Sequence, residues 1–517
     1  MTASAAAGPR STGRVVFAVI LGVIAIAFLV VGVIYLVKPE GSLPAWLGHS
    51  MALVGKKEVP ARNHHTLRAA GCLITGVVFA IGAWFSVSYA GAAYRAAVLG
   101  QDASKPAGET GAEVTEVRLA NGGSVRIACV GGGPAGLYFA LLMKLCGPGN
   151  HVTVYERNQP GTGHGGGVSV DRKLLATMAR FDSESAHQIG RAAVRWQDTV
   201  VSYRGERDVH HDNGVCYSVS RQRFADILAA RAAQLGVSVR FEREVRSAAE
   251  VRDADLVLAA DGAGSTLRGT QAGFGSTVAE GRNKYAWLGT SKAFDGFNFI
   301  FERTDAGWIW AYACRYAPAA STFVVECAPE TWDRLGFADG PASVGLDKIA
   351  EIFAAHLDGH PLSARLPGGT DTSWLSFQTV TNARWHLGRV VLAGDSAHTA
   401  HFSAGLGIAL AIEDVIALAA QLRASACLMA TGIGRGHGAA MSCLVPALDS
   451  YQQQRAPAIR RHAVDAGRSA AWFENMPRYA GLAPRPFAQA VRARRAPLLP
   501  ALPPRIFSLL HRAKEIR

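Results

Sequence analysis

Hydrophobic positions divide the chain into two regions with different patterns. The first region contains two uncharged apolar runs, at residues 15–37 and 69–94, each long enough to cross a bilayer at roughly 20 residues per span. Beyond residue 124 the apolar segments are shorter and switch between strand-like and helix-like periods. This pattern predicts a membrane region at 1–100 with two transmembrane helices, a Gly- and Ala-rich linker at 101–123, and an α/β region after it.

The first apolar segment after the linker leads directly into a glycine-rich turn. Residues 125–130 predict a short buried strand, and residues 134–145 predict an apolar helix. Between them Gly131, Gly133 and Gly136 form G-x-G-x-x-G. A turn of this type brings the backbone and a helix N-terminus close to a pyrophosphate.

A second predicted strand, at residues 151–155, ends in Glu156. A carboxylate at that position can accept hydrogen bonds from the ribose hydroxyls of an adenosine. The glycines alone are weak evidence, but the order strand, glycines, helix, strand and Glu predicts a nucleotide site.

The middle of the chain has a different period. Four strand-like runs rich in aromatic and β-branched residues lie between residues 285 and 327, separated by turn residues. They predict an antiparallel sheet inserted into the α/β framework, which would provide a wall for a flat apolar substrate. Helical spacing flanks this sheet, at 220–236 before it and at 348–356 and 405–422 after it.

Composition and charge narrow the function classes. The chain is 49% hydrophobic and 18% charged, which excludes a disordered protein. Its net charge of +13 would favour anionic lipid or an anionic substrate. We expect no nucleic-acid partner, because no basic stripe with interleaved aromatics is present. We expect no metal site, because the eight cysteines lack a C-x-x-C pair and His64 and His65 lack nearby carboxylates.

Three segments together resemble a known family. They are GGGPAG followed by Glu156, VLAADGAGSTLRG at 257–269, and GRVVLAGDSAHTAHFSAGLGIALAIEDV at 388–415. Their order and spacing resemble the FAD-dependent aromatic hydroxylases over residues 125–479. Within that family the chain is most similar to the hydroxylases of aromatic acyl-CoA thioesters, of the salicylyl-CoA kind.

The resemblance implies a Rossmann-like FAD-binding fold with an inserted antiparallel β substrate domain, preceded by the two transmembrane helices. The domain bounds that we expect are 124–280 for the first part of the FAD-binding domain, 281–375 for the β-rich substrate domain, 376–423 for the second FAD-binding part, and 424–517 for a C-terminal helical region.

The resemblance also implies roles for particular residues. Asp395, after Gly394, would bond the ribityl chain of FAD, and the helix that begins near Gly405 and Gly407 would aim its positive end at the flavin. Glu156 would hold the adenosine ribose, and Asp261 with Gly262 would contact FAD. The other assignments have alternatives: Arg157 lies over the adenine or is exposed, Arg221 touches the phosphate-ribose region or is a surface helix charge, and His401, with His398, faces the site or satisfies a turn.

The activity implied is an FAD monooxygenase that uses NAD(P)H and O2 to hydroxylate or epoxidise an aromatic or lipophilic electron-rich substrate, with an aromatic acyl-CoA as one candidate. Alternatives are a membrane-associated flavin reductase or epoxidase of prenyl-type substrates and a non-catalytic flavin-binding scaffold. A halogenase is disfavoured, because Tyr312-Ala313 follows Trp308-Ile309-Trp310 where that class has Ile-Pro.

Two positions depart from the pattern of many family members. Phe402 replaces Pro, as in the acyl-CoA hydroxylases, and Ala409 replaces Asn. The two apolar runs are foreign to that subfamily, and their alternative is a pair of buried helices. The length of the two runs predicts a two-span membrane protein in contact with lipid. Because a nucleotide cofactor is available in the cytosol, we expect the catalytic domain to be cytoplasmic.

Overall fold

The computed structural model describes residues 124–162, 166–338, 345–364, 373–425 and 437–497, together with Pro504. The two predicted spans, at 15–37 and 69–94, lie outside these ranges. Within the described ranges, no helix is both long enough and apolar enough to cross a membrane.

The first sheet is mostly parallel and carries the nucleotide motif at its centre. Its described strands have the order β14-β15-β7-β1-β2-β6, and only β14 runs antiparallel to its neighbour. The inner strands β1, β7 and β15 are short and mostly buried apolar runs, as expected for parallel strands. The bounds are β1 (Arg126–Val130), β2 (His151–Tyr155), β6 (Ser238–Arg240), β7 (Leu256–Ala259), β14 (His386–Leu387) and β15 (Val390–Leu392).

The second sheet is larger and has the order β12-β8-β11-β10-β9-β4-β5-β3, with β13 paired to β8. The four strands predicted between residues 285 and 327 are confirmed as the end of β8 and as β9, β10 and β11. The sheet also includes β3, β4 and β5, which precede it in the chain and were not predicted. The bounds are β3 (Gly167–Asp171), β4 (Val194–Tyr203), β5 (Glu206–Ser220), β8 (Ser276–Thr290), β9 (Phe297–Thr304), β10 (Gly307–Ala317), β11 (Ala320–Cys327), β12 (Leu362–Ser363) and β13 (Leu375–Asn382).

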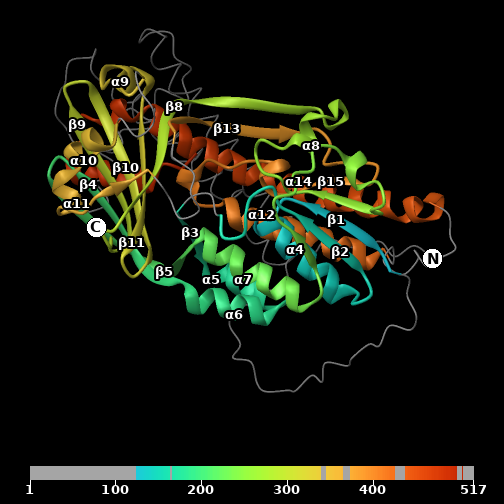
Figure 1. Cartoon of the computed structure of the whole chain (residues 1–517). Helices are drawn as coiled ribbons and strands as arrows, with labels where there is room; N and C mark the ends of the chain where they lie inside the picture. The colour runs from blue at the N-terminus through green and yellow to red at the C-terminus, as the bar shows by residue number, and fades with distance from the viewer. Residues whose placement is uncertain are drawn as a thin grey trace, which may run out of the picture. The chain divides into compact units, whose positions relative to one another are not determined.

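Helices connect and cover the two sheets (Figure 1). The predicted helix at 220–236 is confirmed as α7 (Arg221–Gln234): Ser220 caps its first turn by accepting from the Arg223 N–H at 3.4 Å. The other helices used below are α4 (Pro134–Cys146), α8 (Thr266–Gly269), α10 (Leu346–Ile352), α11 (Ala354–Leu357), α12 (Gly407–Ala424), α14 (His437–Glu474) and α15 (Pro484–Arg492).

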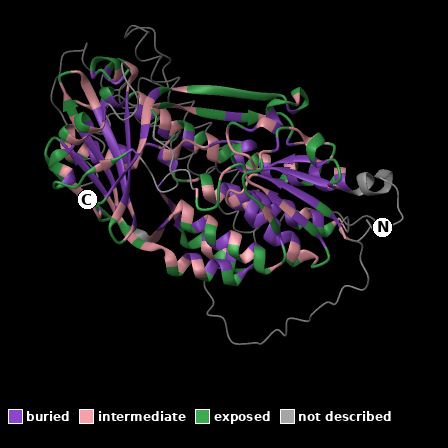
Figure 2. Ribbon diagram, viewed as in Figure 1, coloured by how far each residue is buried: buried purple, intermediate pink, exposed green. Residues whose placement is uncertain are grey.

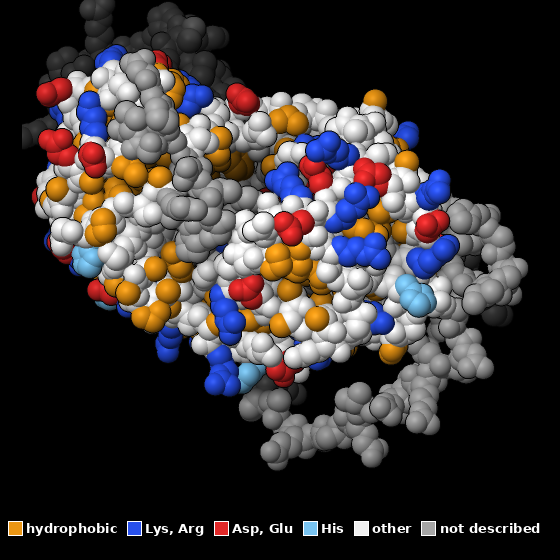
Figure 3. Space-filling model, viewed as in Figure 1, with side chains coloured by type: hydrophobic (Ala, Val, Ile, Leu, Met, Phe, Trp, Pro, Cys, Tyr) orange, Lys and Arg blue, Asp and Glu red, His pale blue; other side chains and the backbone are white. Residues whose placement is uncertain are grey.

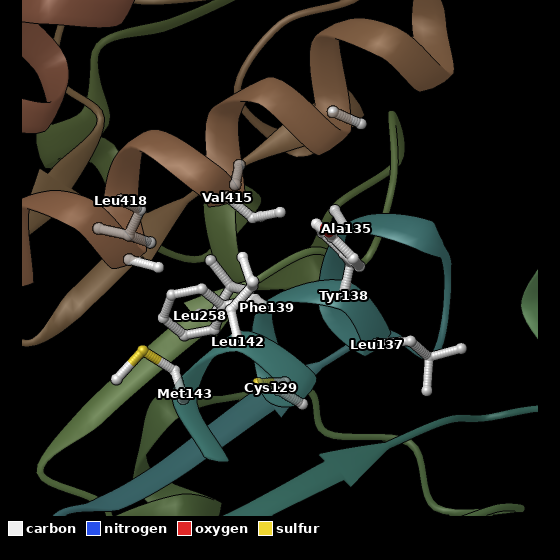
Figure 4. Packing of buried hydrophobic residues seen from close by; sticks show 14 of the residues in the cluster. Cys129, Ala135, Leu137, Tyr138, Phe139, Leu142, Met143, Leu258, Val415 and Leu418 are labelled. Carbon is white, nitrogen blue, oxygen red and sulfur yellow. The ribbon is translucent and has the colours of Figure 1, made fainter. Parts of the chain in front are cut away.

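The hydrophobic core explains why the parallel sheet is rigid where the glycine turn leaves it. Helix α4 is apolar around its circumference, because it packs between the sheet and α12. Figure 4 shows Phe139, Leu142 and Met143 of α4 near Val415 and Leu418 of α12. Figure 2 shows buried positions along the inner strands of both sheets, whereas β13 and the first part of β8 are largely exposed.

The larger sheet is covered on both faces. One face packs against α10 and α11 through Ile349 and Phe353. The other face is aromatic and packs against α14 and α15 through Trp472, Phe473 and Phe487. This aromatic face continues toward the parallel sheet, where it becomes the wall of a cavity.

Candidate active site

The glycine turn has the geometry that the sequence predicts for a dinucleotide site. Gly131 has φ +109°, and a Cβ there would lie 2.2 Å from the Ala260 carbonyl oxygen. A Cβ on Gly136 would lie 2.0 Å from the Gly131 carbonyl oxygen. A Cβ on Gly133 would meet no atom within 4 Å, because Gly133 faces a cavity. Gly131 and Gly136 therefore permit backbone packing, while Gly133 leaves room for a ligand.

The cavity beside this turn measures about 350 Å³ and gathers most of the predicted site residues. Two predicted glycines do not line this cavity: Gly136 packs against the Gly131 carbonyl, and Gly405 lines a neighbouring cavity. The predicted residues that line the first cavity are Gly131, Gly133, Glu156, Arg157, Arg221, Asp261, Gly262, Gly394, Asp395 and Gly407.

Glu156 is fixed at the end of β2 by backbone donors. Its Oε2 accepts from the Gly132 N–H at 2.7 Å, and its Oε1 accepts from the Asn158 N–H at 2.9 Å. The carboxylate thus joins the end of β2 to the glycine turn. Arg157 is exposed at the cavity rim, so its placement over the adenine stays a prediction.

Arg221 and Asp395 both line the two cavities, and each influences the pKa of the other. The pKa of Arg221 is lowered, because burial outweighs the opposing effect of Asp395. The pKa of Asp395 is raised, because burial outweighs the opposing effect of Arg221. The alternative that Arg221 is a surface helix charge is wrong, because its Nε is buried and lacks a hydrogen-bond partner among the described residues.

Asp261 also has an unsatisfied buried atom. Its Oδ2 accepts from the Leu267 N–H at 3.3 Å, but within the described part of the chain its Oδ1 has no partner. An unpaired buried polar atom costs about 1–3 kcal/mol. FAD offers phosphate oxygens to Arg221 and ribose or ribityl hydroxyls to Asp261 and Asp395. The residues present therefore fit this cofactor.

A buried charge network supports the Gly394 corner. Asp414 is fully buried, and its Oδ2 accepts from the Gly394 N–H at 3.1 Å. The same carboxylate lies 2.6 Å from Nε2 of His398 and accepts from Nε of Arg455 at 2.8 Å. Burial would raise the pKa of Asp414, but His398 and Arg455 lower it below its ordinary value. His398 belongs to this network rather than to a cavity wall.

Arg268 links the segments 257–269 and 388–415 by hydrogen bonds, and the sequence did not predict this role. It is buried, and its guanidinium donates to the Ser396 carbonyl at 3.0 Å and to the Ala263 carbonyl. These contacts join the Asp261-Gly262 loop to the Gly394-Asp395 corner. The available signal was that Arg268 is the one basic residue in the segment VLAADGAGSTLRG.

A second cavity of about 620 Å³ shares Arg221, Asp395, Gly407 and Ile408 with the first. Its walls come from the aromatic face of the larger sheet and from the turn before α12. The aromatic residues that line it are Tyr285, Trp287, Phe297, Tyr312, Phe377 and Phe402. The two cavities together accommodate an elongated cofactor and a flat apolar ring beside it.

The N-terminus of α12 lies where the two cavities meet. Gly405 has φ +64° and ends the short turn η6 (Phe402–Ala404). Leu406 then precedes the helix without a side-chain cap, so the N–H groups of the first turn have no side-chain acceptor there. The partial positive charge of this helix end favours an anionic group in the cavity.

His401 takes the second of its predicted roles, that of a turn residue. Its Nδ1 accepts from the Ser403 N–H at 3.3 Å and lies 2.7 Å from the Ser403 hydroxyl. It stacks on Phe402 and does not line either cavity. Burial, with the nearby Arg494, lowers the pKa of His401 to about 4, so the imidazole is neutral at neutral pH. The structure thus shows the turn contacts of His401, and a catalytic role for this residue stays a prediction.

A family model described as "FAD binding domain" matches residues 124–464. The chain belongs to this FAD-binding family, and its relatives described below are named as a hydroxylase and a monooxygenase. FAD is therefore its cofactor. On the face shown in Figure 3, Lys and Arg side chains gather over the part that contains the parallel sheet, which suits an anionic dinucleotide.

Two relatives of this monooxygenase show how far the likeness extends. Salicyloyl-CoA 5-hydroxylase from Streptomyces sp is 35% identical over 69% of this chain and 66% of its own length. The 3-hydroxy-4-methyl-anthranilyl-(aryl-carrier protein) 5-monooxygenase of Streptosporangium sibiricum is 34% identical over 68% of this chain and 90% of its own. The chain thus spans about two thirds of the first relative and most of the second.

Among solved structures, 2-methyl-3-hydroxypyridine-5-carboxylic acid oxygenase aligns with a TM-score of 0.54 at 18% identity, over 71% of this chain and 96% of its own. PqsL of P. aeruginosa in complex with 2-aminobenzoylacetate aligns with a TM-score of 0.53 at 18% identity, over 69% of this chain and 99% of its own. These alignments support the fold: an α/β FAD-binding arrangement with a second, larger sheet.

Two glycine substitutions should separate cofactor binding from folding. Gly133→Ala points a methyl group into the open cavity, so it should weaken FAD binding at least about tenfold with unchanged unfolding. Gly136→Ala forces a methyl group onto the Gly131 carbonyl and should lower the free energy of unfolding by about 1–3 kcal/mol. FAD titration and denaturant unfolding measure the two effects. Equal behaviour of the two variants in both assays would contradict this assignment.

Substitution of Asp414 tests the network below the Gly394 corner. Asp414→Asn leaves Arg455 without its buried counter-charge and should cost about 3–5 kcal/mol in denaturant unfolding. Because the folded-state pKa of Asp414 is lowered, the wild type should lose this stability as the pH falls below about 4, and the variant should show a shallower acid slope. Glu413→Gln is the control: Glu413 contacts the same Arg455 at 3.1 Å but is 31% exposed, so its loss should cost less than about 1 kcal/mol.

Proposed function

We propose that this protein uses NAD(P)H and O2 to hydroxylate an aromatic ring whose carboxyl group is masked as a thioester. The observation that carries this proposal is the charge of the second cavity. Among its described lining residues Arg221 is the one Lys, Arg or His side chain, and the carboxylate of Asp395 lines the same cavity. A free ring carboxylate would therefore be desolvated without a cation of its own.

A buried carboxylate behind the cavity wall strengthens this argument. Glu326 on β11 is 1% exposed, and its oxygens accept from the Tyr312 hydroxyl and from Nδ2 of Asn283, both at 2.6 Å. Burial raises the pKa of Glu326 to about 7. Tyr312 lines the second cavity, so a second carboxylate there would raise the electrostatic cost further.

The names of two relatives agree with a masked carboxyl group. One acts on a salicyloyl-CoA and the other on an anthranilyl group carried by an aryl-carrier protein. Both are aromatic acids joined to a carrier. Phe402, at which the chain resembles the acyl-CoA hydroxylases, forms part of the wall and lies 4.8 Å from Tyr285 and 5.4 Å from Tyr312 between ring centres.

When bound, FAD supplies the redox chemistry that activates O2 and delivers one oxygen atom. The residues of this chain supply binding, orientation and exclusion of water. Arg221 would hold the phosphate oxygens of the cofactor, and Asp395 and the α12 N-terminus would hold the part that meets the second cavity. Aromatic side chains there would hold the ring in place and exclude water from the reacting atoms.

We further propose that segments 15–37 and 69–94 anchor the protein in a membrane with the catalytic region in the cytoplasm. The support is their length and lack of charge. Release of the full chain from cell membranes should require detergent, and release by an alkaline wash alone would contradict the anchor.

A comparison of two substrates tests the proposed reaction. The full chain in detergent, loaded with FAD, should oxidise NAD(P)H and take up O2 with 2-hydroxybenzoyl-CoA at a kcat/KM at least about tenfold above that with 2-hydroxybenzoate. A matched Asp395→Asn variant should lose the stimulation. An equal response to both substrates would contradict the masked-carboxyl argument.

The same assay separates the alternative functions. A reductase of prenyl-type substrates would consume NAD(P)H without incorporating oxygen into product. A non-catalytic scaffold would show neither stimulated NAD(P)H oxidation nor oxygen uptake. Either result would replace the hydroxylase assignment.

A further inference from the structure

We propose that Arg494 and Arg495, which follow α15, are positioning residues for the active site. In this proposal they hold the turn that carries Phe402 and leads into α12. The segment lies beyond the part that the family model matches, which ends at residue 464. The inference deepens the proposed function and rests on it for its catalytic consequence.

The two guanidinium groups hold consecutive carbonyls of one turn. Nη2 of Arg494 donates to the Ser403 carbonyl at 2.8 Å, and Nη2 of Arg495 donates to the Ala404 carbonyl at 2.6 Å. The next residue is Gly405, whose φ of +64° redirects the chain into α12. The pair therefore fixes the point at which the turn ends and the helix begins.

A third contact locks the same turn through a shared hydroxyl. Ser469 on α14 is fully buried, and its Oγ lies 2.8 Å from the Ser403 hydroxyl. Nε of Arg494 donates to this Ser469 oxygen at 2.9 Å. Arg494 thus reaches Ser403 both directly through its carbonyl and indirectly through Ser469.

The charge of Arg494 distinguishes this clamp from ordinary packing. Arg494 is 8% exposed, and its hydrogen-bond partners within the described chain are carbonyls and a hydroxyl rather than a carboxylate. Burial and the neighbouring Arg495 lower the pKa of Arg494 to about 9, so it stays charged at neutral pH. Its guanidinium lies 4.8 Å from the ring centre of Phe299, which offsets part of the cost of burial.

A buried charge without a counter-ion is costly unless its hydrogen bonds are specific. An apolar side chain could fill the same volume at less cost. It could not hold two carbonyl groups and a hydroxyl in fixed directions, as a planar guanidinium does. The geometry therefore points to orientation of the turn as the role of this residue.

Displacement of the turn would alter both cavities. Phe402 in this turn contacts Tyr285, Trp287 and Tyr312 on the wall of the second cavity. Gly407 and Ile408 at the start of α12 line both cavities. A shift of the turn would change the position of a substrate ring relative to the cofactor.

In a monooxygenase such a shift is expected to uncouple the reaction. O2 would then take two electrons from NAD(P)H, with two protons, and leave as H2O2 instead of donating an oxygen atom to the ring. NAD(P)H oxidation would continue while hydroxylated product falls, because small errors of position are costly to oxygen transfer.

Arg494→Lys and Arg495→Lys test this role in the full-length, FAD-loaded protein, because lysine keeps the charge but loses the planar fork. With 2-hydroxybenzoyl-CoA we expect the ratio of product to NAD(P)H consumed to fall about tenfold and H2O2 to rise correspondingly. Without substrate, we expect the visible absorption bands of bound FAD to shift. Arg492→Gln is the matched control, because Arg492 contacts Asp208 and not the turn, and it should retain wild-type coupling and spectrum.

Three outcomes would overturn the proposal. One is wild-type coupling and spectrum in both lysine variants, and another is equal uncoupling in Arg492→Gln. The third is a loss of coupling that only follows the fraction of unfolded protein. If Arg494→Lys does not fold, Arg495→Lys and Ser469→Ala give the same test.

Failure of the proposed function is distinguishable from failure of this inference. If no thioester is hydroxylated by the wild type but the lysine variants still shift the FAD spectrum, the positioning role stands and the substrate assignment falls. If the wild type hydroxylates the thioester and the variants match it in coupling and spectrum, the positioning role falls alone.

Discussion

Close backbone packing at the carboxyl ends of β1, β7 and β15 is the constraint on which the rest of the structure depends. The Ala260 N–H donates to the Val130 carbonyl at 2.8 Å, and the Ala393 N–H donates to the Ala259 carbonyl at 3.1 Å. These bonds place the glycine turn, the Asp261-Gly262 loop and the Gly394-Asp395 corner at one edge of the sheet. Ligands of open α/β sheets bind at this edge, beyond the carboxyl ends of the strands.

The buried ionisable groups near the two sheets differ in whether they are paired with an opposite charge. At the parallel sheet, the buried carboxylate of Asp414 is compensated by His398 and Arg455, so the corner that faces the cofactor is held by a satisfied network. At the aromatic sheet, Glu326 and Arg494 are buried in separate places without a directly paired opposite charge in the described chain. Ionisable groups without a paired opposite charge are rarely buried in cores. Here Glu326 bonds to Tyr312 of the second cavity, and Arg494 bonds to the turn that carries Phe402.

Sequence reasoning succeeded where the signal was local. The glycine turn, the helix predicted at 220–236 and the four aromatic strands are each encoded by neighbouring residues, and the structure contains all of them. It missed strands β3 to β5, because their place in the second sheet depends on a parallel pairing of β4 with β9, about a hundred residues later. It also missed Arg268, Asp414 and Arg494, whose roles depend on partners brought together only by folding.

The role of His401 could not be predicted from the sequence either. Its position in a recognised motif suggested a place in the site, but a histidine in a turn can satisfy its own backbone, and the Ser403 contacts show that it does so. The position of a residue in a motif thus predicts which part of the site it lies near, but not the direction in which its side chain points.

The central claim is that FAD lies between the glycine turn and the Gly394-Asp395 corner. A structure of the full chain bound to FAD tests it most directly. The account predicts the pyrophosphate at Gly133, with the flavin ring between Asp395 and the N-terminus of α12. A cofactor located elsewhere, or a folded protein that binds no FAD at all, would contradict it.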